Sequence, residues 1–382
     1  MTRGFSVWLD AVRASAAIIV LLSHYAYPWA SGGSLTWMRD LNLGSDAVVV
    51  FFVLSGLVIT HTATTKDRTC SAFALARVSR LYSVALPALL TSFVCGWLAT
   101  SINPQAFTML SPEDASFGPS EIAGQLIRGV TFTNYVGVEA KRIVANGPYW
   151  SVSYEFWYYV LFGGWMFLRG RIRVLVTGLI CLLLGPPILL LAPCWLVGVV
   201  VYRILTSPKR NELPLATAWS FAILPLVAYA ALLAAGAPRL LFALTQMSLG
   251  GATPYSLYFS DEFVWNFVLA LLVAMHFIGV ARLIRDRSRR LRHAQDLVRW
   301  LAARTFSLYL LHMPIMKLGA SLPGYQATNP LHATILLAGT VATCLILAEG
   351  TERRLPFWRE TFSRLAMYFS STFARGHPSY QR

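Results

Sequence analysis

Three ionisable side chains stand in the first apolar stretch of the sequence, where charge is costly and therefore indicates function. Asp10 and Arg13 are three residues apart and can pair on one helical face. His24 follows Arg13 within about 20° of three full turns, so it shares that face about 16 Å further along the axis. A neutral imidazole is well suited to accept a proton from a hydroxyl. The stripe predicts an acid–base site; the alternative is a snorkelling arginine and an interfacial histidine.

A glutamate stands among aromatic residues near the start of another apolar segment, residues 149–167. Ser151 and Glu155 are four residues apart and share a helical face. A carboxylate in such surroundings needs a partner or a proton. We expect the partner to come from the ionisable groups of other apolar segments: Arg13, His24 and Arg304.

Further polar and aromatic side chains lie where apolar segments could enclose a ligand. Tyr149 and Trp150 could stack on a sugar, or they could belong to an interfacial aromatic belt. Tyr309 and His312 are three residues apart and can face the interior of a helix bundle together. For His312, a structural role and a chemical role both remain open.

Two arginines, Arg77 and Arg80, are one helical turn apart in a basic loop between apolar segments. Guanidinium groups at this spacing could grip phosphates. The alternative is simple positive charge at the inner membrane surface.

The composition requires a membrane. Of 382 residues, 56% are hydrophobic and 13% are charged, against about 25% charged in soluble domains. The net charge of +15 is spread in short clusters between apolar runs, which argues against nucleic acid as a partner and fits membrane orientation signals. The spacing of the cysteines predicts neither a disulfide framework nor a metal site: Cys70, Cys95, Cys181, Cys194 and Cys344.

The apolar runs predict an all-α, polytopic bundle of about ten membrane spans, since about 20 residues cross the hydrocarbon core. We read the first as a retained span rather than a signal peptide, because it holds an ion pair. The fifth and sixth could be a tight hairpin or a re-entrant element. The predicted spans are 7–27, 47–64, 82–102, 149–167, 172–185, 188–205, 215–235, 264–283, 301–318 and 333–348.

The distribution of lysine and arginine predicts the orientation. With the N-terminus in the cytoplasm, the inner segments hold 24 of these residues and the outer segments hold 6. This asymmetry predicts that both termini are cytoplasmic. We expect a transmembrane domain over 1–350 and a basic cytoplasmic tail over 351–382. Two long outer segments, 103–148 and 236–262, could cap a pocket or be plain surface loops.

Six short motifs follow one another along the chain, and together they resemble membrane-bound acyltransferase family 3. Members of that family O-acylate cell-surface polysaccharides, peptidoglycan, Nod factors and macrolides. The chain departs from the family pattern at Ala76 and Ser83, where Arg and Pro are common. The motifs are Leu9-Asp10-x-x-Arg13 with His24, Phe51 to Leu57, Arg77-x-x-Arg80-Leu81, Trp150-Ser151-x-x-x-Glu155 with Tyr158, Ser307 to Leu310 with His312 and Pro314, and Glu352 before Pro356.

The resemblance implies an enzyme of the bacterial cytoplasmic membrane. It would use acetyl-CoA or another acyl-CoA as a cytoplasmic donor, no metal, and a carbohydrate or glycolipid acceptor reached from the membrane or the outer side. His24 would act on the acceptor hydroxyl or on acyl passage, with Arg13 essential nearby. We group Asp10 and Glu155 with them as catalytic candidates.

The resemblance also divides the remaining polar candidates between donor and acceptor. Arg77 and Arg80 would hold the phosphates of the donor. A transporter or flippase for a glycan or lipid-linked sugar, using the same buried groups, is the alternative function. The candidates for substrate binding are Tyr149, Trp150, Ser151, Tyr309 and His312.

Overall fold

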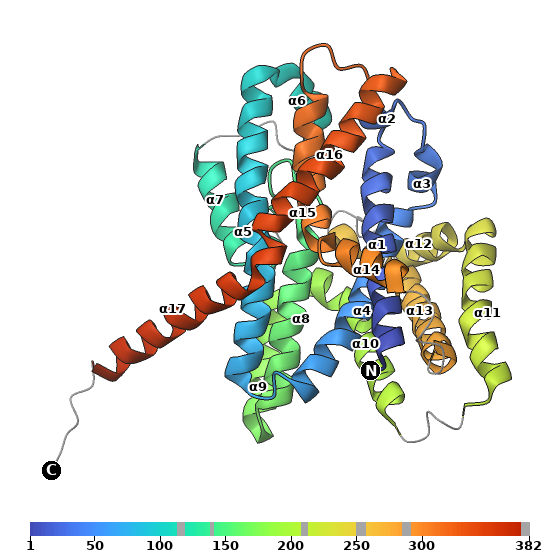
Figure 1. The fold of residues 1–382 in the computed structure, drawn as a ribbon, viewed down its shortest axis with the longest axis vertical. Coiled ribbons are helices and arrows are strands. Elements are labelled where there is room, and N and C mark those ends of the chain that lie inside the picture. Colours follow the sequence, from blue (N-terminus) through green and yellow to red (C-terminus); the bar gives the residue numbers. More distant parts are fainter. Residues whose placement is uncertain (113–118, 138–140, 208–212, 250–256, 285–291, 376–382) are drawn as a thin grey trace.

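The computed structural model describes residues 1–112, 119–137, 141–207, 213–249, 257–284 and 292–375, and throughout these ranges the regular elements are helices (Figure 1). Parts of the two long predicted outer segments lie outside the described residues, as do 208–212, the arginine-rich 285–291 and the last residues of the predicted tail. The all-α prediction is confirmed over the described part of the chain.

Seven of the described helices are long and apolar enough to cross a membrane, which confirms a multi-pass membrane protein. The last of them is the apolar part of a longer continuous helical segment, Pro330–Tyr368. The seven are α1 (Arg3–Tyr25), α4 (Leu43–Thr65), α5 (Cys70–Ile102), α10 (Pro186–Thr206), α11 (Leu215–Ala234), α13 (Phe263–Leu283) and α16 (Pro330–Gly350).

Three other predicted spans form helices that are not among the seven. These are α8 (Tyr149–Phe167), α9 (Gly170–Leu184) and α15 (Thr305–Ala320). α9 and α15 have 15 and 16 residues, fewer than the hydrocarbon core requires of a straight helix. A span count of ten and the orientation of the termini therefore stay predictions.

Shorter elements connect the long helices. Gly185, with a φ of 76°, separates α9 from α10 and places the two helices next to one another. The shorter helices are α2 (Pro28–Ser31), α3 (Thr36–Asp40), α6 (Pro104–Leu110), α7 (Pro119–Val130), α12 (Ala237–Ser248), α14 (Arg292–Ala302) and α17 (Leu355–Arg375), with single 3-10 turns η4 (Tyr258–Ser260) and η6 (Glu352–Arg354).

The predicted basic loop is part of a helix. α5 starts at Cys70, because the Thr69 hydroxyl caps its first turn by accepting from the Ala72 amide at 3.2 Å. Its 33 residues give a length of about 50 Å, well beyond a hydrocarbon core of about 30 Å. Arg77 and Arg80 therefore lie on a rigid continuation of a membrane helix, and their spacing is fixed by that helix.

Two glycines allow α4 and α10 to pack with their backbones in contact. A Cβ atom added at Gly56 would lie 2.0 Å from the Trp195 carbonyl oxygen, and one added at Gly198 would lie 2.0 Å from the Val53 carbonyl oxygen. Small residues at such crossings are the usual basis of close packing between membrane helices. The crossing brings the Trp195 indole beside Ser55 on α4, where the indole nitrogen donates to the hydroxyl at 3.1 Å.

α15 lies inside the bundle, against α1, α5 and α16. α16 is followed by the η6 turn and by α17, which projects away from the bundle in Figure 1. The ring of Phe362 on α17 packs 5.6 Å from that of Tyr82 on α5. The helices α1, α5 and α15 carry most of the side chains that the sequence marks as functional.

Candidate functional site

A cavity lies where α1, α4, α5, α8 and α15 meet. The space open to the centre of a water-sized sphere is about 160 Å³. Apolar residues of α4, including Phe51 and Phe52, form one part of its wall. Its polar lining consists of Arg13, Ser55, Arg77, Arg80, Ser151, Glu155, Tyr159, Thr305 and Tyr309.

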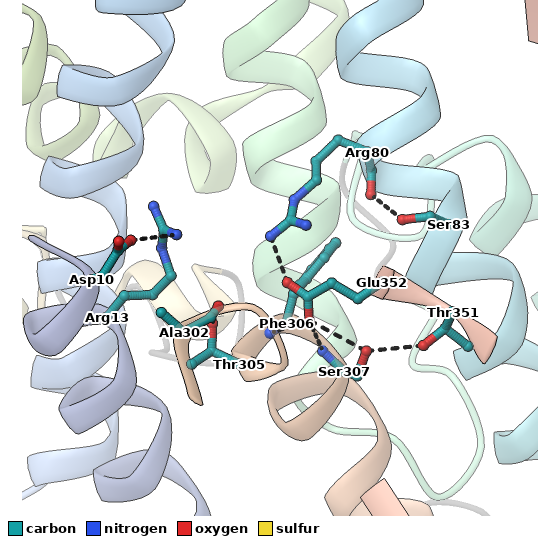
Figure 2. Close-up of polar contacts among 10 residues, drawn as sticks. All are labelled: Asp10, Arg13, Arg80, Ser83, Ala302, Thr305, Phe306, Ser307, Thr351 and Glu352. Carbon is teal, nitrogen blue, oxygen red and sulfur yellow. Dashed lines mark hydrogen bonds and ion pairs between the residues drawn. The ribbon is translucent and has the colours of Figure 1, made fainter. Parts of the chain in front are cut away.

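The predicted ion pair on the first helix is present. Arg13 Nη1 lies 3.4 Å from Asp10 Oδ1, and both side chains are partly exposed. The i, i+3 spacing on α1 places the two groups on one face. Figure 2 shows Arg13 on α1 beside the junction of α14 and α15, where Ala302 and Thr305 lie. Arg13 places its guanidinium group in the cavity lining, and Asp10, which is not part of that lining, pairs with it.

Arg80 is held by a carboxylate from the other end of the chain. Its Nη2 donates to Glu352 Oε1 at 2.6 Å, and the Glu352 side chain is almost completely buried. The second oxygen, Glu352 Oε2, accepts from the backbone amides of Phe306 and Ser307, each at 3.1 Å (Figure 2). Glu352 therefore joins Arg80 on α5 to the first turn of α15, where a negative charge is favourable.

Arg77 lines the same cavity one turn before Arg80. Its Nη2 donates to Asp67 Oδ2 at 2.8 Å, and its Nε is buried with no hydrogen-bond partner among the described residues. Both arginines of the predicted donor pair therefore face the cavity from α5, each oriented by one carboxylate. The remaining guanidinium donors can serve an anionic ligand.

Glu155 is satisfied by hydroxyl groups. Its Oε1 accepts from Ser55 Oγ and from Tyr159 Oη, each at 2.5 Å. The expected partners make other contacts, since Arg13 pairs with Asp10, and Arg304 donates to Glu349 from its Nε at 2.8 Å. None of the three expected partners forms an ion pair with Glu155 among the described residues, because Ser55 of α4 occupies this face of α8. Arg13 faces the same cavity without direct contact. As predicted, Ser151 and Glu155 share a face, and both line the cavity.

Tyr309 and Ser151 meet at the cavity wall. The Tyr309 hydroxyl lies 2.6 Å from Ser151 Oγ and donates to the Pro148 carbonyl oxygen at 3.3 Å. The contact ties α15 to the start of α8. Both residues belong to the cavity lining.

The two predicted histidines are in contact with each other. His24 Nδ1 lies 3.1 Å from His312 Nε2 and 3.0 Å from the carbonyl oxygen of Val20. His312 Nδ1 lies 2.9 Å from the carbonyl oxygen of Leu308. His312 is completely buried, while His24 is partly exposed and stacks with Tyr27. The pair lies one helical turn beyond Tyr309 on α15.

Tyr149 and Trp150 pack behind the cavity wall, where the Trp150 ring lies 6.1 Å from that of the lining residue Phe52. The buried Tyr149 hydroxyl donates to the Gly129 carbonyl oxygen at 3.0 Å, which ties α8 to α7. The Trp150 ring stacks on Phe259 with centroids 4.5 Å apart. Neither residue lines the cavity, so their predicted contact with an acceptor rests on the sequence alone.

Comparison with known proteins decides the family. A family described as an acyltransferase domain matches residues 6–349, nearly the whole chain. The chain belongs to acyltransferase family 3. It is also 26% identical over 162 residues to an "O-acetyl transferase" of Shigella phage Sf6, an alignment that covers 40% of this chain and 44% of the relative. No solved structure matches.

The chain is therefore a multi-pass membrane member of acyltransferase family 3, and its alignment spans less than half the length of the curated relative. Transfer of an acyl group to a hydroxyl is helped by a base that accepts the hydroxyl proton. The cavity offers three guanidiniums, and the two histidines lie one turn beyond its Tyr309 edge. Sequence reasoning missed the contacts of Ser55, Tyr159 and Trp195 with this site. The available signal for Ser55 was its place inside the Phe51 to Leu57 motif.

Proposed function

We propose that this acyltransferase moves an acyl group from a cytoplasmic acyl-CoA to a hydroxyl of a carbohydrate-type acceptor, with His24 as the general base. The observation that carries the proposal is the placement of one arginine-lined cavity and one histidine pair along the same two helices, α1 and α15. The cavity would hold the donor, and His24 would face the acceptor.

The charges of the cavity support an anionic donor. Arg13, Arg77 and Arg80 face one space whose lining includes a single carboxylate, Glu155. The carboxylates that pair with the three arginines lie outside this lining, so the guanidinium donors left over point to a ligand with anionic oxygens. Guanidinium groups bind phosphate oxygens in bidentate geometry, and a partly dehydrated site strengthens the attraction. The pyrophosphate and ribose phosphate of acyl-CoA are ligands of this kind. Arg77 and Arg80 on the α5 extension would meet them first at the cytoplasmic surface.

The length of α1 supports the path of the acyl group. Arg13 and His24 are separated by about 16 Å along the helix axis, a distance that calls for a long, flexible linker between charged head and reacting carbon. The pantetheine arm of CoA is such a linker. It would run from the arginines past Ser151 and Tyr309 and present its thioester near His24, on the side of the predicted outer face.

The proposed reaction is a single acyl transfer. The acceptor hydroxyl gives its proton to His24, and its oxygen attacks the thioester carbonyl. The carbon–sulfur bond then breaks, CoA leaves as the thiolate, and the proton held by His24 returns to the departing sulfur or to solvent. General-base catalysis of this type contributes about 10²- to 10⁴-fold to the rate.

The proposal is tested by His24→Ala in cells that lack the wild-type protein. Mass spectrometry of surface glycans compares O-acyl content in strains with wild type, with the variant and without the protein. We expect His24→Ala to abolish acylation at an unchanged amount of protein in the membrane. The matched control His332→Ala, at the start of α16, is expected to acylate normally. Wild-type acylation by the His24 variant would contradict the assignment of the base.

A further inference from the structure

We infer that His312 is a positioning residue that selects the reactive tautomer of His24 and orients its ring. The inference rests on the proposed function, because it concerns the base of that reaction, but its geometry is independent of it. It follows from the hydrogen-bond contacts of the two imidazole rings.

The tautomer of His312 follows from its carbonyl partner. His312 Nδ1 lies 2.9 Å from the carbonyl oxygen of Leu308, one turn earlier on α15. A carbonyl oxygen only accepts, so His312 Nδ1 must carry the hydrogen. In the neutral ring, His312 Nε2 is then left with a lone pair and no hydrogen. The ring is completely buried, so this acceptor is shielded from water and faces His24.

The tautomer of His24 follows from that of His312. His24 Nδ1 lies 3.0 Å from the carbonyl oxygen of Val20 and 3.1 Å from His312 Nε2. Both neighbours are acceptors, so His24 Nδ1 must be the protonated nitrogen and shares its hydrogen between them. His24 Nε2 is therefore the nitrogen with the free lone pair, and it is the atom that can take a proton from a hydroxyl.

Two acceptors from different helices fix more than the tautomer. The Val20 carbonyl belongs to α1 and moves with His24, whereas His312 belongs to α15. The ring centroids lie 5.0 Å apart and the planes meet at 39°, so rotation of the His24 ring would break the contact. When His24 accepts a proton at Nε2, the lone pair of His312 also stabilises the positive charge through Nδ1–H. A carboxylate performs this task beside the histidine of a serine protease.

Three substitutions of His312 differ in whether they leave a hydrogen-bond acceptor at the position of Nε2. His312→Leu removes the hydrogen-bond acceptor and fills the buried position with an apolar side chain. His312→Gln keeps an oxygen acceptor close to the position of Nε2. His312→Asn is shorter, so its amide lies near the position of Nδ1 and does not reach His24. The set therefore separates loss of the acceptor from a general disturbance of the core.

The kinetic test measures release of CoA thiol from acetyl-CoA by the purified full-length protein. The acceptor substrate is a surface-glycan extract from cells that lack this protein. We expect His312→Leu and His312→Asn to lower kcat about 10- to 100-fold, as other partners of functional histidines do, with the KM for acetyl-CoA unchanged. His312→Gln should recover most of kcat. A kcat within twofold of wild type for His312→Leu, or a failure of Gln to exceed Asn, would overturn the inference.

The spectroscopic test needs no activity. Nitrogen-15 NMR of histidine-labelled protein distinguishes protonated from unprotonated ring nitrogens, and His24→Gln identifies the His24 signals among the 7 histidines. We expect an unprotonated His24 Nε2 in the wild type and a mixture of tautomers in His312→Leu. A His24 with hydrogen on Nε2 in the wild type would refute the inference. Normal transfer by His24→Ala would instead refute the proposed function.

Discussion

Replacement of Glu352 by alanine tests whether this one carboxylate joins the end of the chain to the site. Glu352 accepts from two backbone amides at the start of α15 and pairs with Arg80 on α5. Loss of a side-chain cap at a helix start destabilises by about 1 kcal/mol. Loss of a charge-assisted contact to Arg80 adds about 1–2 kcal/mol, at the low end because the Arg80 side chain is 31% exposed.

The total of about 2–3 kcal/mol converts into a shift of the melting temperature. With about 2.1 cal/mol/K per residue, a chain of 382 residues has an unfolding entropy near 0.8 kcal/mol/K. Glu352→Ala is therefore expected to lower Tm by about 3–4 °C. Glu352→Gln keeps an acceptor for the amides and loses only the ionic part, so its Tm should fall by about half as much.

The assay is thermal unfolding of the detergent-solubilised protein followed by intrinsic tryptophan fluorescence. Glu360→Ala is the matched control, because Glu360 forms an exposed pair with Arg364 that contributes little. Its Tm should lie within 1 °C of wild type. A Glu352→Ala variant that also melts within 1 °C of wild type would refute the account of this contact. Arg80→Ala and the double variant complete the cycle and isolate the ionic part.

Two further predictions concern the donor site and the helix crossing. In the thiol-release assay, Arg77→Ala should raise the KM for acetyl-CoA about tenfold with little change in kcat, because a donor contact is lost. A tenfold change equals about 1.4 kcal/mol of binding free energy. Arg171 is an exposed arginine on α9, and the control Arg171→Ala should leave KM unchanged. Gly56→Ala should destabilise the protein by at least 1–3 kcal/mol, because the added methyl group meets the Trp195 backbone, whereas Gly178→Ala, which meets nothing within 4 Å, should melt like wild type or slightly higher. An equal Tm for the two glycine variants would contradict the close crossing of α4 and α10.

Periodicity and hydropathy predicted the helices and the contacts within them. Lipid demands long apolar runs, so helices occur at all of the predicted span positions. The Asp10–Arg13 pair and the shared face of Ser151 and Glu155 followed from helical spacing, which acts over one turn. The start of α5 was missed, because a basic amphipathic stretch carries no strong hydropathy signal.

Contacts between helices could not be read from spacing. Glu155 meets Ser55 across 100 residues, Arg80 meets Glu352 across 272, and His24 meets His312 across 288. Each contact depends on which helices pack together. A single sequence carries no periodic signal for that choice of neighbours. For this reason the hydroxyl partners of Glu155 were not predicted. Composition and buried charges fit both an enzyme and a transporter. The order of the six motifs favoured the enzyme, and the family match over 6–349 supports that choice.

The most direct test of the proposed mechanism is sided acyl transfer in oriented proteoliposomes. Labelled acetyl-CoA is supplied only on the side where the Arg77 end of α5 is exposed, and the surface-glycan extract only on the other. We expect label in the glycan on the far side with wild type, and none with His24→Ala at an equal amount of protein. Equal label with the His24 variant, or transfer only when donor and acceptor share one side, would contradict it.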